Sequence, residues 1–267
     1  MKVFGFQFAP IRHRKDENQA IVEQMLADAS PPPGSFVVLP EMFDSSWTFD
    51  VDAATAGDSP GWAARVAQQF QIHLQIGFGR RVSRAPGATN ATVIAHPDGR
   101  LGAVYEKMHP FGFTEEPRHY AAGTRLVLDQ VGPFTIAPTI CYDLRFPELY
   151  RHAALAGANL ITVIASWPTL RIAHWRAMLI SRAIENQAFV VGVNRVGADP
   201  DHQYGGESLI ISPLGEILAD SGSKPAVISA DIDPRTTLDW RTTFPALEDH
   251  RPDLLKPIPE AEFGVEP

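Results

Sequence analysis

The stretch FTIAPTICYDLRFPELYRHAALAGANLITVI, residues 134–164, predicts a strand, a helix and a second strand in direct succession. Its apolar runs Phe134–Ile140 and Asn159–Ile164 have the length and composition of buried strands. Between them, Pro147–Ala156 has a helical pattern that starts with proline, which is favoured in the first turn of a helix. Strands and helices that alternate in this way are typical of an α/β fold.

The rest of the chain continues this alternation. Further helices are expected over Glu17–Ala29, Ser59–Phe70 and Leu170–Gln187. The segments 90–106 and 208–219 carry Pro-Asp-Gly and Ser-Pro-Leu-Gly between apolar runs, which predicts two β-hairpins. Hairpins and helical connections together predict mixed sheets with helices packed outside them. The other expected strands are Val3–Ala9, Ser35–Leu39, Ile72–Phe78, Asn90–His96, Leu101–Glu106, Phe189–Val193, Ser208–Ser212, Glu216–Ala219 and Ala226–Ile232.

Composition indicates an ordinary globular protein. The chain has 267 residues, 45% of them hydrophobic and 20% charged, with a formal charge of −8. This charge argues against nucleic acid and anionic membranes as partners. A single cysteine permits no disulfide within the chain, and neither a secretory signal nor a membrane span is evident, so we expect a cytoplasmic protein. We expect one domain over residues 1–267, in which about 233–267 is a C-terminal tail that packs on the domain or on a partner subunit.

Three expected strands end in a reactive side chain. Glu41 follows the first, Lys107 the second and Cys141 the third. Strand ends are the usual location of ligand sites in α/β sheets. A carboxylate can accept the thiol proton and an ammonium can stabilise the resulting anion, so the three groups together could form a nucleophilic site. Taken singly, each also fits a structural role, as a buried small residue, a helix cap or an exposed lysine.

Four motifs resemble the nitrilase, or carbon–nitrogen hydrolase, superfamily: PEMF (40–43), YEKMHPFGF (105–113), CYDLRFPEL (141–149) and RAIENQAFVVGVNRVG (182–197). The likeness runs from Met1 to about Ile232. The segments HYAAGT (119–124) and ASWPTLRIAHWRAMLISRAIENQ (165–187) are most similar to the omega-amidase branch. The resemblance implies a four-layer α-β-β-α sandwich of two mixed sheets flanked by helices. It also implies hydrolysis of a small-molecule amide through a cysteine thioester, with no metal and no organic cofactor.

The resemblance also assigns roles to residues. It implies that Glu41, Lys107 and Cys141 are catalytic and that Glu116 supports them, with Glu115 as the alternative. The backbone N–H of Tyr142 is expected to help hold the oxyanion. Members of the family commonly form homodimers or larger homo-oligomers, here through the helices Pro147–Ala156 and Leu170–Gln187.

The candidate substrate contacts are Phe43, Trp47, Arg145 and Trp167. Arg145 is the first candidate to bind a substrate carboxylate, since a guanidinium can hold a carboxylate through two hydrogen bonds. The alternative is an ion pair of Arg145 with Glu148 or Asp143 that only shapes the turn. Pro110 and Trp47 depart from the usual family pattern at positions where a substrate could be contacted.

Other thiol and metal chemistries fit less well. Arg145 stands too near Cys141 for a phosphatase loop, and the papain-type cysteine signature and the His-Glu-x-x-His zinc motif are absent. Within the family, three substrate groups stay open: the omega-amides 2-oxoglutaramate and 2-oxosuccinamate, deaminated glutathione, and N-carbamoyl compounds. A non-catalytic member that only binds a small molecule is the alternative of another class.

Overall fold

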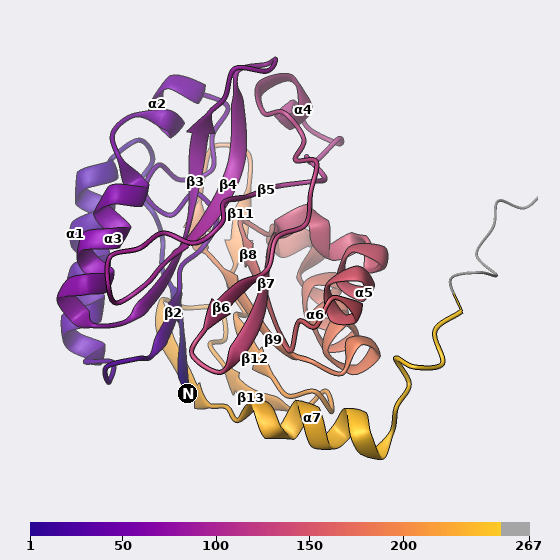
Figure 1. Ribbon diagram of the computed structural model, residues 1–267. Helices are drawn as coiled ribbons and strands as arrows, with labels where there is room; N and C mark the ends of the chain where they lie inside the picture. Colours follow the sequence, from indigo (N-terminus) through magenta and orange to yellow (C-terminus); the bar gives the residue numbers. More distant parts are fainter. Residues whose placement is uncertain (252–267) are drawn as a thin grey trace, which may run out of the picture.

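Two six-stranded sheets form the centre of the molecule in a computed structural model, which describes residues 1–251 (Figure 1). The first sheet has the strand order β14 (Ala226–Asp231), β1 (Lys2–Gln7), β2 (Phe36–Val38), β3 (His73–Arg81), β4 (Ala88–Ala95), β5 (Tyr105–Glu106). The second has the order β13 (Ile217–Asp220), β12 (Leu209–Ile211), β9 (Phe189–Asn194), β8 (Leu160–Ala165), β7 (Phe134–Ile140), β6 (Asp129–Val131).

Both sheets are mixed. The central strands β1, β2 and β3 are parallel, as are β7, β8 and β9 in the second sheet. The strands outside them pair antiparallel, including the expected hairpins β4–β5 and β12–β13. The remaining elements are α1 (Lys15–Ala29), α2 (Val51–Thr55), α3 (Ser59–Phe70), α4 (Glu116–His119), the 3₁₀ turn η1 (Cys141–Arg145), α5 (Pro147–Leu155), the 3₁₀ turn η2 (Thr169–Arg171), α6 (Ile172–Asn186), the ribbon β10 (Val196–Ala198) with β11 (Gln203–Gly205), and α7 (Pro234–Thr243).

Three apolar cores separate four layers. Helices α1 and α3 cover the outer face of the first sheet, where Leu26 and Trp62 pack beside Ile76. A second core, which includes Phe36 and Ile140, fills the space between the sheets. In the third, Trp175 of α6 is buried among residues of the second sheet and α5. The expected α-β-β-α sandwich is therefore confirmed. The core shared by the two sheets supports our proposal that the chain is a single domain.

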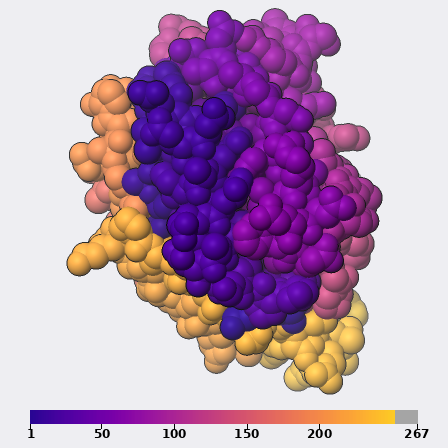
Figure 2. Space-filling view, turned by 90° about the vertical axis from the view of Figure 1, so that its left-hand side faces the viewer, coloured from indigo at the N-terminus to yellow at the C-terminus, as the bar shows by residue number. Residues whose placement is uncertain are grey.

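The space-filling view shows the first of these layers from outside. Residues from the first third of the chain, in α1 and α3 and their connections, occupy most of this face (Figure 2). The C-terminal segment runs along its lower margin. Within the described residues, every helix is too short or too polar to cross a membrane.

Some element boundaries differ from those expected. The predicted strand Leu101–Glu106 is reduced to β5, because only a single bridge from Leu101 to Ala95 precedes it. The expected helix Ser59–Phe70 keeps its bounds as α3, and Asp58 caps it, since its carboxylate accepts the backbone N–H of Gly61 at 2.9 Å. The predicted helix Leu170–Gln187 is divided into η2 and α6.

The first part of the predicted tail packs on the second sheet's helical layer. It contains α7, from which the Arg241 guanidinium donates hydrogen bonds to the carbonyls of Ala158, Asn186 and Gln187. The Gln187 amide in turn donates to the carbonyl of Phe244 at 2.7 Å. These bonds tie the segment to the ends of α5 and α6. Residues 252–267, the rest of the predicted tail, lie outside the described residues.

Candidate active site

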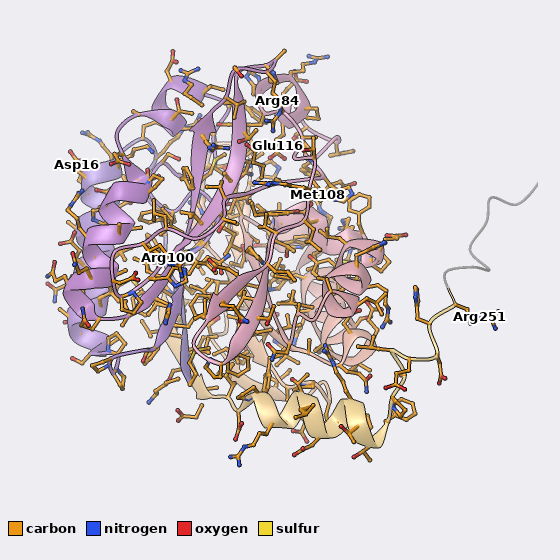
Figure 3. The ribbon with its side chains drawn as sticks, in the orientation of Figure 1. Asp16, Arg84, Arg100, Met108, Glu116 and Arg251 are labelled. Carbon is orange, nitrogen blue, oxygen red and sulfur yellow. The ribbon has the colours of Figure 1, made fainter. Side chains whose placement is uncertain are left out.

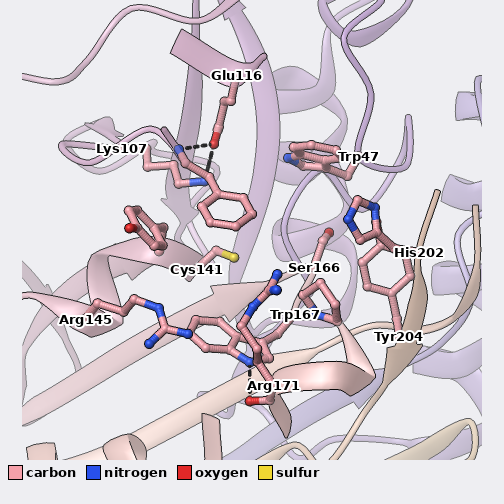
Figure 4. Close-up of a pocket in the computed structure, with 13 residues that line it drawn as sticks. Trp47, Lys107, Glu116, Cys141, Arg145, Ser166, Trp167, Arg171, His202 and Tyr204 are labelled. Carbon is pink, nitrogen blue, oxygen red and sulfur yellow. Dashed lines mark hydrogen bonds and ion pairs between the residues drawn. The ribbon is translucent and has the colours of Figure 1, made fainter. Parts of the chain in front are cut away.

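Three chain segments that follow strand ends meet between the two sheets. Glu41 comes shortly after β2, Lys107 directly after β5, and Cys141 directly after β7. Cys141 begins η1 with a φ of 48°, in the left-handed region that non-glycine residues rarely adopt. Backbone strain of this kind is concentrated at functional sites. The turn directs the sulfur away from the strand and into a pocket (Figure 4).

Lys107 lies between two buried carboxylates. Its Nζ is 2.9 Å from both carboxylate oxygens of Glu116 and 3.2 Å from Oε1 of Glu41. The lysine side chain is only 2% exposed, and both glutamates are fully buried. Burial alone would lower the pKa of Lys107, but the charges of Glu116 and Glu41 raise it above the ordinary value. Lys107 is therefore a permanent cation at neutral pH.

Glu41 is fixed by donors from three parts of the chain. Besides Lys107, the amide of Asn90 donates to its Oε1 at 2.7 Å and the backbone N–H of Ser166 to its Oε2 at 2.8 Å. Gly77 allows this position, because a Cβ there would lie 2.9 Å from the Glu41 Cα. The carboxylate thus has a defined orientation beside Lys107.

Glu116, and not Glu115, joins the cluster. In addition to Lys107, it accepts the backbone N–H of Phe111 at 2.6 Å and the Asn90 amide at 3.1 Å. Glu115 is exposed and pairs with Arg118 on the surface. Of the two adjacent acids that the sequence analysis left open, Glu116 is the one that contacts Lys107.

Cys141 faces this cluster across the pocket. Burial raises the pKa of its thiol, the charge of Glu41 raises it further, and the charge of Lys107 opposes the rise. The thiol is therefore neutral at rest and needs a base before it can act as a nucleophile. The structure thus brings Glu41, Lys107, Glu116 and Cys141 together, as the sequence analysis expected.

The pocket contains two guanidinium groups on the side away from Glu116. Arg145 lies 5.0 Å from the centre of the Trp167 ring and 6.0 Å from that of Tyr142. Arg171 lies 5.4 Å from the centre of the Phe111 ring and extends into the pocket (Figure 4). In residues 1–251 neither guanidinium pairs with a carboxylate. The nearest polar contact of Arg145 is His174, at 3.3 Å.

The alternative ion pairs expected for Arg145 are not formed. Asp143 is turned away from it and accepts hydrogen bonds from Tyr105 and His109. Glu148 is exposed and makes no ion pair with it. Arg145 has five N–H donors and, within residues 1–251, a single polar contact, with His174, so it keeps most of its donors available to a ligand. Arg171 makes no side-chain hydrogen bond in the same range.

Aromatic side chains form the remaining walls, with one correction to the sequence analysis. Trp47, Tyr142 and Trp167 line the pocket. Phe43 does not: it is fully buried in the core under α3 and stacks on Trp62 with 5.1 Å between ring centres. Because Phe43 packs in the core between the first sheet and its helices, its ring does not reach the pocket.

Several residues of the site, in the carboxylate cluster or in the pocket lining, were not found from the sequence. Asn90 carried a weak signal, as a polar residue in a fully buried strand. Ser166, Arg171, His202 and Tyr204 carried none, since they belong to turns and to the short ribbon β10–β11. The pocket encloses about 430 Å³ of empty space, including its opening to solvent. No group of three or more histidine, cysteine or acidic side chains suited to a metal ion occurs in residues 1–251.

A sequence profile of the carbon-nitrogen hydrolases matches residues 6–242, and the chain belongs to this family of enzymes. It is 33% identical over 226 residues to a 2-oxoglutaramate amidase of Bacillus subtilis, covering 82% of this chain and 85% of that protein. It is 36% identical over 217 residues to the omega-amidase YafV of Escherichia coli, covering 80% and 83%.

The fold is also similar to that of a solved structure. XC1258 from Xanthomonas campestris, described as a CN-hydrolase superfamily protein with an arsenic adduct in the active site, superposes with a TM-score of 0.86 and 28% identity. The superposition covers 94% of this chain and 97% of that one. The predicted family, fold class and enzyme class are confirmed.

Proposed function

We propose that this enzyme is an omega-amidase-type thiol hydrolase, which cleaves the terminal amide of a small carboxylated substrate of the 2-oxoglutaramate or 2-oxosuccinamate type to the acid and ammonia. The observation that carries the proposal is one pocket lined by Cys141, Lys107 and Glu116, in which Lys107 also pairs with Glu41. Two guanidiniums without a carboxylate partner in residues 1–251 lie on the opposite side. The cysteine with its lysine and acids suits amide hydrolysis, and the two guanidiniums suit the binding of a substrate carboxylate. The names of the relatives described above support the same substrate class.

The first half of the reaction forms a thioester. Glu41 takes the thiol proton as the Cys141 sulfur attacks the amide carbon, and the carbonyl oxygen becomes an oxyanion. Lys107 and the backbone N–H of Tyr142 stabilise this oxyanion, where one such donor contributes about 3–4 kcal/mol. Glu41 then returns the proton to the nitrogen, the C–N bond breaks and ammonia leaves.

Protonation of Glu41 also frees Lys107. At rest the ammonium group contacts three carboxylate oxygens, so its three N–H donors are all in use. When Glu41 accepts the thiol proton, it loses its negative charge, and its electrostatic attraction to Lys107 becomes weaker. Glu116, which keeps its charge, holds the ammonium in place while one N–H turns to the oxyanion. This gives the two acids different roles.

The second half hydrolyses the thioester. Glu41 deprotonates a water molecule, whose oxygen attacks the thioester carbon, and the carboxylic acid is released as the thiol regains a proton. No step in this scheme uses a metal or an organic cofactor. Arg145 binds the carboxylate at the far end of the substrate, and Arg171 is placed to assist it on the same side of the pocket.

Ammonia release from a panel of amides tests the proposal. The panel contains 2-oxoglutaramate, 2-oxosuccinamate, deaminated glutathione and an N-carbamoyl amino acid, each assayed with the wild-type enzyme and with Cys141→Ala. We expect the highest kcat/KM for the two omega-amides. A preference for deaminated glutathione or for the N-carbamoyl compound would replace the substrate assignment while keeping the reaction class.

A non-catalytic binding role has a separate test. Brief exposure of the protein to a good amide substrate, followed by intact-mass measurement, should reveal the acyl adduct on wild-type protein and none on Cys141→Ala. A thiol that acquires no adduct, in a protein that releases no ammonia from any amide of the panel, would support a protein that only binds small molecules.

Self-association through α5 and α6 is part of the proposal. Leu155 of α5 and Ile184 of α6 are exposed on the outer surface of the second helical layer. Burial of such side chains in a homodimer would remove apolar surface from water. Light scattering coupled to size exclusion should give at least twice the 29.3 kDa chain mass. Leu155→Glu should lower that mass, whereas Leu238→Glu on α7 is the matched control. The cytoplasmic location stays a prediction from the sequence.

A further inference from the structure

A second cavity lies on the outer side of the edge strand β5, away from the candidate active site. It is lined by Arg80, Arg84, Val104, Glu106, Thr124 and Arg125, and encloses about 730 Å³ including its opening to solvent. None of these residues lines the pocket of Cys141. Figure 3 shows Arg84 near the outer end of the β3–β4 hairpin, above Glu116. We call this space the arginine cavity.

The arginine cavity and the candidate active site use neighbouring residues of one strand segment. Glu106 contributes its side chain to the cavity, and Lys107, the next residue, contributes its side chain to the active-site cluster. Successive side chains of an extended chain point to opposite sides. A ligand of the cavity would therefore bind next to the backbone of Lys107 without meeting the substrate.

Glu106 holds two of the guanidiniums in place. Its Oε1 is 2.8 Å from Arg80 Nη1, and its other carboxylate oxygen pairs with Arg84. Thr89 adds a hydrogen bond at 3.2 Å, and the Glu106 side chain is only 14% exposed. Burial raises the pKa of Glu106, but the hydrogen bonds from Arg84 and Arg80 lower it overall, so the carboxylate stays charged. The two arginines are thus positioned before any ligand arrives.

The cavity has more positive than negative charge. Its lining, in the part of the chain that the structure describes, has three guanidiniums and one carboxylate, so two positive charges are not balanced within it. Arg125 makes no ion pair or side-chain hydrogen bond with any other residue of the range 1–251. Each guanidinium has five N–H donors, and Arg80 and Arg84 use only a few of theirs, on Glu106 and on the carbonyl of Ala122. Several guanidinium N–H groups of the cavity therefore remain available to a ligand, and those of Arg80 and Arg84 are held in position by Glu106.

We propose that the arginine cavity is a binding site for a small doubly charged oxyanion, such as inorganic phosphate, a phosphate monoester or a short dicarboxylate. The planar guanidinium matches the spacing of phosphate and carboxylate oxygens, and two excess charges match a dianion. Among the described residues that line the cavity, Val104 is the only apolar one, and none of them has an aromatic ring. A nucleobase or an apolar acid would find no surface to stack on, which restricts the ligand to small polar anions. This proposal does not depend on the substrate assignment above.

Isothermal titration with inorganic phosphate and, separately, with succinate tests the proposal at constant ionic strength. We expect saturable binding to the wild-type protein, weakened about tenfold or more by Arg125→Gln, as expected when one charge-assisted contact is lost. Arg125→Gln removes no ion pair or side-chain hydrogen bond between described residues, so it should fold normally. Arg84→Gln should weaken binding as well. The anion with the lower Kd shows whether the site prefers a phosphate or a dicarboxylate.

Two control variants locate the binding. Arg100→Gln removes an exposed arginine of the β4–β5 turn that is outside the cavity and should bind phosphate as the wild type does. Arg145→Gln removes a guanidinium of the active-site pocket and should also leave the affinity unchanged. Absence of saturable binding of either anion to the wild type would overturn the proposal. So would equal affinity in Arg125→Gln, or a loss of affinity in Arg145→Gln alone.

Discussion

The buried carboxylate of Asp143 accepts two hydrogen bonds from His109, one from its backbone N–H at 3.0 Å and one from its ring Nδ1 at 2.9 Å. Its other oxygen accepts the Tyr105 hydroxyl at 2.8 Å and the backbone N–H of Ile140 at 3.0 Å. Asp143 lies two residues beyond Cys141, whereas Tyr105 and His109 flank Lys107. One side chain therefore fixes the cysteine turn relative to the segment that carries the lysine.

This relationship predicts the effect of Asp143→Asn. The amide keeps the shape of the carboxylate but turns an N–H₂ group toward two donors, so we expect a loss of about 2–3 kcal/mol in the free energy of unfolding. Displacement of Cys141 relative to Lys107 should also lower kcat about tenfold or more. Urea unfolding and steady-state kinetics measure both effects. Glu148→Gln is the exposed control, and equal behaviour of the two variants would contradict the positioning role.

Cys141→Ala should abolish amide hydrolysis and keep the fold. The thioester requires the sulfur, and the alanine side chain fits the space of the thiol. Cys141→Ser should be nearly inactive too, because a hydroxyl is much harder to ionise. Ammonia release measures activity, and circular dichroism checks the fold. Residual hydrolysis by the alanine variant above a trace would rule out the covalent route.

Glu116→Gln and Glu115→Gln form a matched pair of adjacent substitutions. Of these two acids, Glu116 is the one that contacts Lys107. Its loss of charge should therefore reduce kcat by about a hundredfold or more, as expected when the group that aligns an oxyanion donor is lost. Glu115→Gln should change kcat less than about twofold, since a surface ion pair contributes little. Steady-state kinetics with one omega-amide decides the matter. Similar losses in both variants would show that the charge of this segment, and not one contact, is important.

The pKa of Cys141 predicts how stability changes with pH. Burial and the charge of Glu41 raise the thiol pKa in the folded state, so the unfolded state ionises first. Stability should therefore fall as pH rises above about 8.5, the ordinary thiol value, by up to about 1.4 kcal/mol per pH unit until the folded pKa is reached. Comparison of wild type with Cys141→Ala by urea unfolding at several pH values isolates this effect. Parallel pH profiles for the two proteins would mean that the folded pKa is not raised.

Arg145→Lys tests the proposed carboxylate site. Lysine keeps the charge but cannot form the bidentate hydrogen bonds of a guanidinium with a carboxylate. We therefore expect KM to rise about tenfold with little change in kcat or stability. Arg151→Lys on α5, outside the pocket, is the matched control. Kinetics with 2-oxoglutaramate and thermal unfolding distinguish binding of the substrate carboxylate from a structural role in the turn. A lowered melting temperature with an unchanged KM would assign Arg145 to the scaffold.

Local patterns in the sequence were sufficient for most of the fold. The apolar spacing of Glu17–Ala29 predicted α1, and the long runs Phe134–Ile140 and Asn159–Ile164 predicted β7 and β8, because burial on both faces demands continuous apolar strands. Shorter elements such as β6, β10 and β11 were missed, since three residues carry too little periodicity. The strand predicted at Leu101–Glu106 was longer than the observed β5 for a related reason. Alternation of apolar and polar residues does not show where the hydrogen bonds to the neighbouring strand end.

The sequence by itself determined most strands and helices of this protein and placed Glu41, Lys107 and Cys141 at strand ends, because apolar patterns and residue chemistry are local properties. The four-layer arrangement was implied by the family resemblance. Only the tertiary structure decided which neighbours these three residues meet. It selected Glu116 over Glu115, added Asn90 and Arg171 to the site, and moved Phe43 into the core. Contacts between residues far apart in the chain depend on how two sheets pack face to face, and no periodicity within one segment contains that information.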